Sequence, residues 1–201
     1  MIETVSTTEG FEALAPEWDA LVRAMPRPSP FMLHGWLAEW WRHYGDGAEL
    51  RVQVARRDGR LVGALPLVVR RRPGLRVGMF MGGSQAALLD VLGEDCDALV
   101  QRVTEGGCDV LDLHGLPAGS RIATALGPRL ELIERVEAPV LDLTDGWDAV
   151  YRAKTSSKKR SLHRRRRRQL AELGPLEVSV ARTLDELEPA LEEAFDLHAL
   201  R

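Results

Sequence analysis

Apolar residues at helical spacing dominate the first part of the chain. Residues 2–7 predict a short strand, and the pattern after it predicts a helix from Thr8 to about Met25. The apolar positions of that helix recur at intervals of three and four: Phe11, Leu14, Trp18, Leu21 and Val22. A second helix is predicted over residues 34–44, where three tryptophans and a tyrosine point to core packing, and Gly45 ends it.

The pattern then changes to short apolar stretches typical of strands. Residues 50–56 alternate with a period of two, Arg57-Asp58-Gly59 predicts a hairpin turn, and residues 60–70 return as an apolar strand. Further strands are predicted over residues 76–81, 108–113 and 176–181, and two more within residues 130–143.

Helical patterns return in the second half. They predict helices at residues 96–105 and 120–126, a long helix from Gly146 interrupted near residues 155–157, and a last helix capped by Thr183. Together these elements predict an α/β (α+β) protein with a mixed, largely antiparallel sheet flanked by helices.

Composition and charge indicate a globular protein with one strongly basic segment. The chain has 201 residues, of which 45% are hydrophobic and 28% charged, as in ordinary globular domains. A net charge of −3 conceals one segment, residues 152–168, with ten basic residues and no acidic one. This segment can be a solvated face, a site for a phosphorylated substrate or a nucleic-acid contact. Nucleic acid is the least favoured, because the rest of the chain is acidic and no nucleic-acid motif accompanies the run.

Cysteine usage and hydropathy indicate where the chain resides. Cys96 and Cys108 fit no zinc spacing, and we expect two small buried side chains in a reducing compartment and no metal. The longest uncharged stretch, residues 77–89, has thirteen residues. A membrane span needs about 20. With no readable signal peptide, we expect a cytoplasmic protein without a membrane span.

Candidate chemistry is sparse. Asp112 and His114 fall on one face of a predicted strand, where a carboxylate could orient a histidine base. Polar residues at strand ends are common, so a purely structural role stays open. The glycine-rich loops of P-loop and Rossmann nucleotide sites are absent from the sequence.

Four segments, taken in order, resemble a known family. They are PFMLHGWLAEWW at 30–41, GALPL at 63–67, DVLDLHGLP at 109–117 and SKKRSLHRR at 157–165. In this order they resemble the N-terminal part of CelD-type (BioF-like) acyltransferases of the GNAT superfamily, which are related to the Fem-type aminoacyltransferases of peptidoglycan synthesis. The resemblance implies two GNAT-like lobes. Residues 1–182 would form the N-terminal lobe, and residues 183–201 a helix leading to a second lobe beyond residue 201.

The resemblance also implies a donor, an acceptor and an activity. The donor would be acetyl-CoA or another acyl-CoA, bound mainly by the second lobe. The superfamily's pyrophosphate loop, [QR]-x-x-G-x-[GA], is approached only by residues 60–65 and 71–76, and both lack the final small residue. The activity would be transfer of the acyl group to an amine of a sugar or cell-envelope precursor. The alternative is a non-catalytic basic module that binds nucleic acid or anionic surfaces through residues 152–168.

By the same resemblance, the basic segment would bind a small-molecule or sugar-linked acceptor that is anionic or nucleotide-linked. The residues that match the motif are Ser157, Lys158, Lys159, Arg160 and Arg164. The resemblance identifies no catalytic acid or base.

Overall fold

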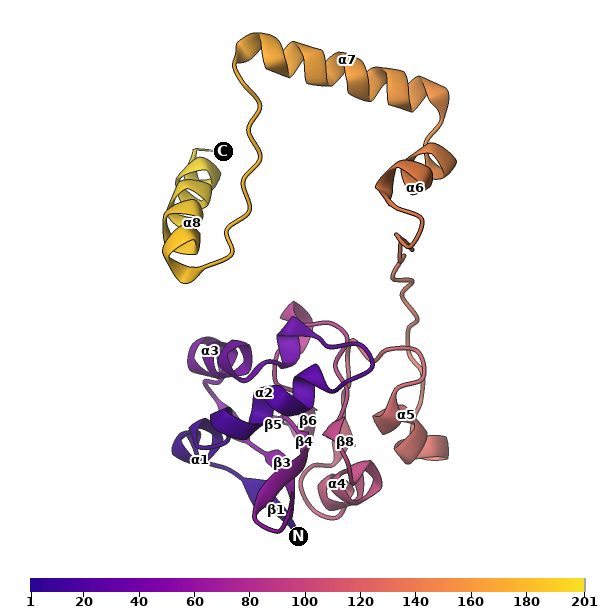
Figure 1. The fold of residues 1–201 in the computed structure, drawn as a ribbon. Coiled ribbons are helices and arrows are strands. Elements are labelled where there is room, and N and C mark those ends of the chain that lie inside the picture. Colours follow the sequence, from indigo (N-terminus) through magenta and orange to yellow (C-terminus); the bar gives the residue numbers. More distant parts are fainter. Residues whose placement is uncertain (201) are drawn as a thin grey trace. The chain divides into compact units, whose positions relative to one another are not determined.

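The computed structural model describes residues 1–200, which belong to two compact units. The first unit is Met1–Glu134, and the second begins at Arg135. Each unit is described by itself below (Figure 1). The expectation that residues 1–182 form one lobe, followed by a helix leading onward, stays a prediction.

One sheet of the first unit is entirely antiparallel. Its strands follow the order β1-β3-β4-β7: β1 (Ile2–Val5), β3 (Val52–Arg57), β4 (Arg60–Leu65) and β7 (Leu92–Gly93). The predicted turn between β3 and β4 is confirmed, with positive φ at Asp58 (51°) and Gly59 (78°). Positive φ at both central residues is what a tight hairpin turn of the right twist requires.

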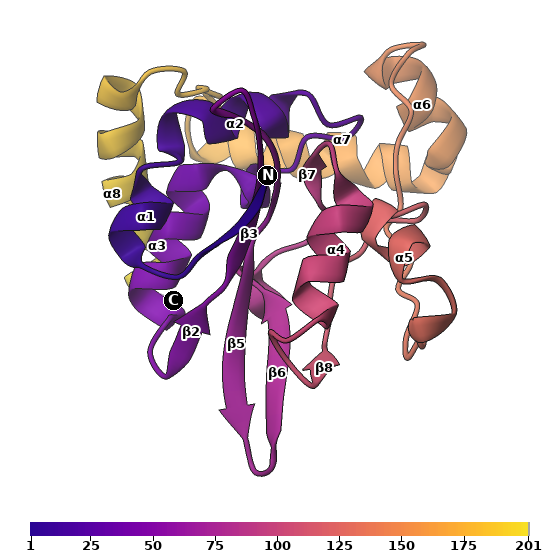
Figure 2. The same cartoon turned by 90° about the horizontal axis from the view of Figure 1, so that it is seen from below.

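The other sheet contains the parallel pair of strands. Its order is β2-β5-β6-β8: β2 (Ala48–Leu50), β5 (Leu67–Arg72), β6 (Leu75–Phe80) and β8 (Val110–Leu111). β5 and β6 form a long antiparallel hairpin (Figure 2), whereas β6 and β8 run parallel. Pro66, which has no backbone N–H, separates β4 from β5 within the single strand predicted over residues 60–70. The prediction of a buried strand over 108–113 is wrong in length and in burial. Only Val110 and Leu111 pair with β6, and Val110 is exposed.

Helices cover these sheets and complete the predicted fold class. They are α1 (Thr8–Glu12), α2 (Ala15–Arg23), α3 (His34–Tyr44), α4 (Cys96–Thr104) and α5 (Arg121–Leu126). The mixed, largely antiparallel architecture flanked by helices is therefore confirmed. The single helix predicted from Thr8 to about Met25 is wrong: it is two helices, and Pro16 occupies the first turn of the second. Proline is tolerated there but would break a continuous helix.

One core fills the first unit. Its largest fully buried side chains include Trp18, Phe11, Phe80, Leu14 and Met32. Of the three tryptophans in α3, Trp40 is buried and Trp36 and Trp41 are half-buried against the core. Their predicted role in packing is confirmed.

The second unit consists of three helices joined by extended segments. They are α6 (Trp147–Lys154), α7 (Ser157–Leu173) and α8 (Leu184–Ala199). The predicted interruption near 155–157 is confirmed, and the Ser156 side chain caps α7 by accepting from the Lys159 N–H. Thr183 begins α8 with a capping box that Glu186 completes.

The strands predicted within residues 130–143 and over 176–181 are wrong. In the structure these segments carry no strand, their side chains are exposed apart from that of Leu130, and among the described residues no strand pairs with them. An alternating pattern does not make a strand when no neighbour accepts its backbone hydrogen bonds.

None of the helices in residues 1–200 combines the length and apolar character needed to span a bilayer.

Candidate functional site

An Asp–His pair stands at the end of β8. His114 Nε2 lies 3.1 Å from Asp112 Oδ1, and the two side chains are 63% and 52% exposed. The two side chains do lie together, but not on a strand face as predicted, because β8 ends before them at Leu111. An imidazole with its proton on Nε2 would face that carboxylate and keep its lone pair on Nδ1.

The pair occupies the point where β6 and β8 separate. The last backbone bond between them runs from the Asp112 N–H to the Gly78 carbonyl, at 2.8 Å. Beyond it β6 stays paired with β5 as far as Phe80, while Gly115 accepts from the Leu89 N–H at 3.1 Å. The sheet thus presents an exposed imidazole beside a carboxylate at the carboxyl end of a parallel strand. Such an imidazole can take a proton from a reacting group.

A second feature is a buried carboxylate, which sequence reasoning missed. Asp90 is only 6% exposed, and its Oδ1 accepts from the Val91 N–H (2.9 Å), the Ser120 hydroxyl (3.0 Å) and the Ile122 N–H (3.1 Å). Its Oδ2 accepts from the Arg121 N–H at 2.8 Å. The bonds from Ser120, Arg121 and Ile122 join the chain around β7 to the start of α5. These three donors lie about thirty residues along the chain, so local spacing gave no signal for them.

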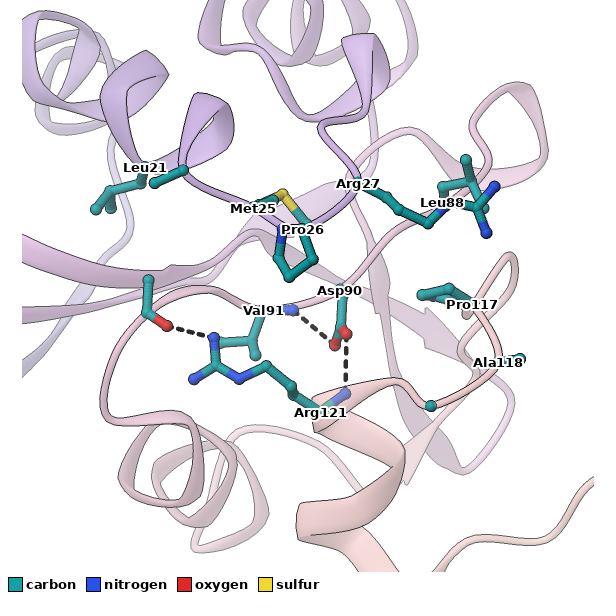
Figure 3. Close-up of a pocket in the computed structure, with 13 residues that line it drawn as sticks. Leu21, Met25, Pro26, Arg27, Leu88, Asp90, Val91, Pro117, Ala118 and Arg121 are labelled. Carbon is teal, nitrogen blue, oxygen red and sulfur yellow. Dashed lines mark hydrogen bonds between the residues drawn. The ribbon is translucent and has the colours of Figure 1, made fainter. Parts of the chain in front are cut away.

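Asp90 also forms part of the wall of a pocket. The pocket has a volume of about 210 Å³ and lies between the end of α2 and the segments 88–93 and 117–121. Met25 and Pro26 lie across the pocket from Asp90 and Arg121 (Figure 3).

The predicted acceptor-binding residues all lie in the first half of the basic helix α7. Ser157 is its first residue, and the side chains of Lys158, Lys159 and Arg164 are exposed. Arg160 differs, because it is half-buried and its guanidinium donates to the carbonyls of Arg152 (3.2 Å) and Thr155. Arg160 therefore fixes the junction between α6 and α7, and the other cations are available to a ligand.

The positive charge of this segment is not neutralised within the described chain. In residues 1–200, no salt bridge joins any basic side chain of residues 152–168 to a carboxylate. The Tyr151 hydroxyl lies 2.8 Å from His163 Nδ1, and the two rings stack, which ties α6 to α7. The second unit thus presents a row of free cations on an ordered helix.

Both cysteines are free thiols, and both are half-buried rather than fully buried as expected. Desolvation raises the pKa of Cys96 to about 11, and burial likewise raises the pKa of Cys108. Between residues 1 and 200, no three His, Cys, Asp or Glu side chains cluster as they would around a metal ion.

The raised pKa of Cys96 predicts slow alkylation at neutral pH. Only the thiolate reacts, so its labelling by iodoacetamide should increase about tenfold per pH unit up to about pH 11. Mass spectrometry of the two cysteine peptides after timed labelling measures this, with a denatured sample as the control. Labelling of the folded protein at pH 7.5 as fast as the denatured sample contradicts the assigned burial.

Comparisons with known proteins gave a limited result. No protein-family model matches the chain, and no curated protein matches it. Among solved structures, a ribosomal-protein-alanine N-acetyltransferase from Brucella melitensis biovar Abortus 2308 is 18% identical, with 71% of this chain and 99% of that chain covered and a TM-score of 0.36. A Trypanosoma brucei acetyltransferase is also 18% identical, with 70% and 99% covered and a TM-score of 0.36. Similarities this weak assign no chemistry to the chain.

Proposed function

We propose that this chain belongs to an N-acyltransferase of the GNAT type, which moves an acyl group from acyl-CoA to an amine of a sugar or cell-envelope precursor. The resemblance of the four sequence segments supports the family, and the mixed sheet with helices on its faces is compatible with it. The observation that carries the proposal is the exposed Asp112–His114 pair at the point where β6 and β8 separate.

The pair supplies the group that amine acylation requires. The amine nitrogen attacks the thioester carbonyl, a carbon–nitrogen bond forms and the carbon–sulfur bond breaks. We propose that the proton lost from nitrogen passes to His114 Nδ1 and that the negative charge of Asp112, whose Oδ1 lies 3.1 Å from Nε2, stabilises the imidazolium. The departing CoA thiolate takes a proton from water, which balances the step.

The two segments most similar in sequence to a pyrophosphate loop do not form a binding site for the donor's diphosphate. Residues 60–65 form strand β4, and residues 71–76 form the tip of the β5–β6 hairpin, so neither precedes a helix. A diphosphate is bound by backbone amides at the start of a helix. We therefore propose that the diphosphate binds outside both segments, as expected for a site mainly in a second lobe.

The proposal also includes a binding site for an anionic group of the acceptor. We assign its binding to the start of α7, where Ser157, Lys158, Lys159 and Arg164 offer a hydroxyl and three cations without carboxylate partners. Arginine and lysine donors there favour phosphate over neutral groups. Arg160 positions the helix, since its guanidinium is bound to backbone carbonyls.

Amine-dependent release of CoA tests the activity. With acetyl-CoA as donor, we expect thiol release to accelerate with glucosamine 6-phosphate, which has an anionic group and a free amine, and not with N-acetylglucosamine 6-phosphate, whose nitrogen is already acylated. A thiol-reactive dye measures the rate, and mass spectrometry identifies the acetylated product. Equal rates with the two sugars contradict transfer to an amine.

A second candidate function rests on the basic segment, residues 152–168, which spans the end of α6 and most of α7. Its ten basic residues within seventeen positions can bind a polyanion such as nucleic acid without any catalysis. On this alternative, anisotropy of a labelled single-stranded RNA should show affinity that falls steeply between about 50 and 200 mM salt. Changing Arg167 and Arg168 together to Glu should abolish the binding.

The matched control replaces Arg135 and Arg182, which lie outside the basic segment, with Glu. This control makes the same change in net charge and should leave most of the affinity. Undetectable RNA binding, or equal loss in both double variants, removes the alternative.

A further inference from the structure

The pocket at the end of α2 has mostly apolar walls. Its apolar side chains come from α2 and the residues that follow it, from the segment before β7 and from the loop before α5: Leu21, Met25, Pro26, Leu88, Val91 and Pro117. A cavity of about 150 Å³ holds benzene. The 210 Å³ available here therefore suits a ligand of about eight or nine non-hydrogen atoms.

The charged side chains around this pocket favour an anion. They are Arg27, Asp90 and Arg121, with a net charge of +1. Asp90 is occupied by four donors and has little capacity left for a ligand. One N–H of the Arg121 guanidinium donates to the Gly93 carbonyl, and within residues 1–200 neither arginine forms an ion pair.

The pocket is held open by its surroundings. The four bonds of Asp90 fix one end of the segment 87–90, and the Ser29 hydroxyl fixes its other end by donating to the Ala87 carbonyl at 3.0 Å. Between them Leu88 has a φ of 57°, a left-handed conformation that a branched side chain rarely adopts. Such strain persists where the surrounding structure imposes it, and it is concentrated at binding sites. A pre-formed pocket loses little ordering entropy when a ligand binds.

We infer that this pocket binds a small apolar anion of the size of an aromatic carboxylate. The ring or chain would contact Met25, Pro26 and Val91, and the carboxylate would pair with the free donors of Arg121, with Arg27 adding positive charge (Figure 3). This inference is independent of the proposed acyl transfer, because His114 does not line the pocket.

Three compounds of the same shape separate charge from size. Benzoate, benzamide and benzamidine are an anion, a neutral molecule and a cation of nearly equal volume, and each can be titrated into the protein by calorimetry or ligand-observed NMR. We expect benzoate to bind with one-to-one stoichiometry, about tenfold more tightly than benzamide. Benzamidine should bind more weakly than benzamide, because the arginines repel it.

Variants locate the binding. Arg121→Gln should lower the affinity for benzoate about tenfold and leave that for benzamide unchanged. Arg102→Gln is the matched control, since Arg102 is an exposed arginine on α4 that does not line the pocket. Ala24→Trp places an indole at the exposed edge of the pocket and should abolish binding of both compounds.

The inference is overturned by any of three results: no benzoate binding up to about 10 mM, benzamide binding as tightly as benzoate, or an unchanged affinity in Arg121→Gln. Thermal unfolding establishes that each variant is folded. If Ala24→Trp does not fold, the comparison of Arg121→Gln with Arg102→Gln decides the question alone.

Discussion

Asp90→Ala is expected to destabilise the protein by about 4 kcal/mol. The buried carboxylate accepts from three backbone N–H groups and one hydroxyl, and alanine leaves all four donors without a partner. Each buried donor left unpaired costs about 1–3 kcal/mol, and water entering from the adjacent pocket offsets part of the sum. Urea unfolding followed by tryptophan fluorescence measures the change in the free energy of unfolding.

Two further variants make this measurement specific to the Asp90 bonds. Asp90→Asn keeps the size but turns one acceptor into a donor that faces an N–H, so we expect a loss of about 2 kcal/mol. Asp97→Ala removes an exposed carboxylate from the first turn of α4, and its effect should stay within about 0.5 kcal/mol. A loss of less than about 1 kcal/mol for Asp90→Ala contradicts the role assigned to the network.

Trp18→Ala is expected to cost a similar amount, about 3–5 kcal/mol. The indole is completely buried, and its N–H donates to the Met32 carbonyl at 2.8 Å. Its ring meets the edge of Phe11 at a centroid distance of 5.5 Å and packs beside His34 at 6.0 Å. Truncation removes apolar burial, leaves a cavity between α2 and α3 and frees a buried carbonyl. Chemical denaturation measures the loss.

Trp18→Phe separates packing from hydrogen bonding. Phenylalanine fills most of the space but cannot donate to Met32, so we expect a loss of about 2 kcal/mol. Leu75→Ala, at the exposed tip of the β5–β6 hairpin, is the control and should change the free energy of unfolding by less than about 0.5 kcal/mol. If Trp18→Ala costs no more than this control, α2 does not anchor the core as described.

Much of the fold could be predicted where local chemistry decides the structure. The Asp58-Gly59 turn, the end of α3 at Gly45 and the cap of Thr183 on α8 depend on residues within a few positions of one another. Pro16 was an available signal for the break between α1 and α2, and the periodic apolar pattern around it concealed that signal. The strands predicted near residues 130–143 and 176–181 failed because a strand depends on a partner, which no local pattern reveals.

Of the candidate sites, the one formed by neighbouring residues could be predicted from the sequence, and the one formed by distant segments could not. Asp112 and His114 are two residues apart just after β8, so local spacing in the sequence was enough to single them out as a pair. The Asp90 network and its pocket bring together segments near residues 25, 90 and 120. Their proximity is a result of tertiary folding, and no spacing in the sequence indicates it.

The rate of amine acetylation in His114→Ala, compared with His43→Ala, tests the proposed function most directly. Both histidines are exposed and both lie near a carboxylate, since His43 Nε2 is 3.6 Å from Glu39 Oε2 on α3. Because His114 is the proposed proton acceptor, we expect kcat to fall about a hundredfold in His114→Ala, with KM for acetyl-CoA little changed. His43→Ala should retain the full rate. Equal rates in the two variants would contradict the assignment of His114 and remove the observation on which the proposed function rests.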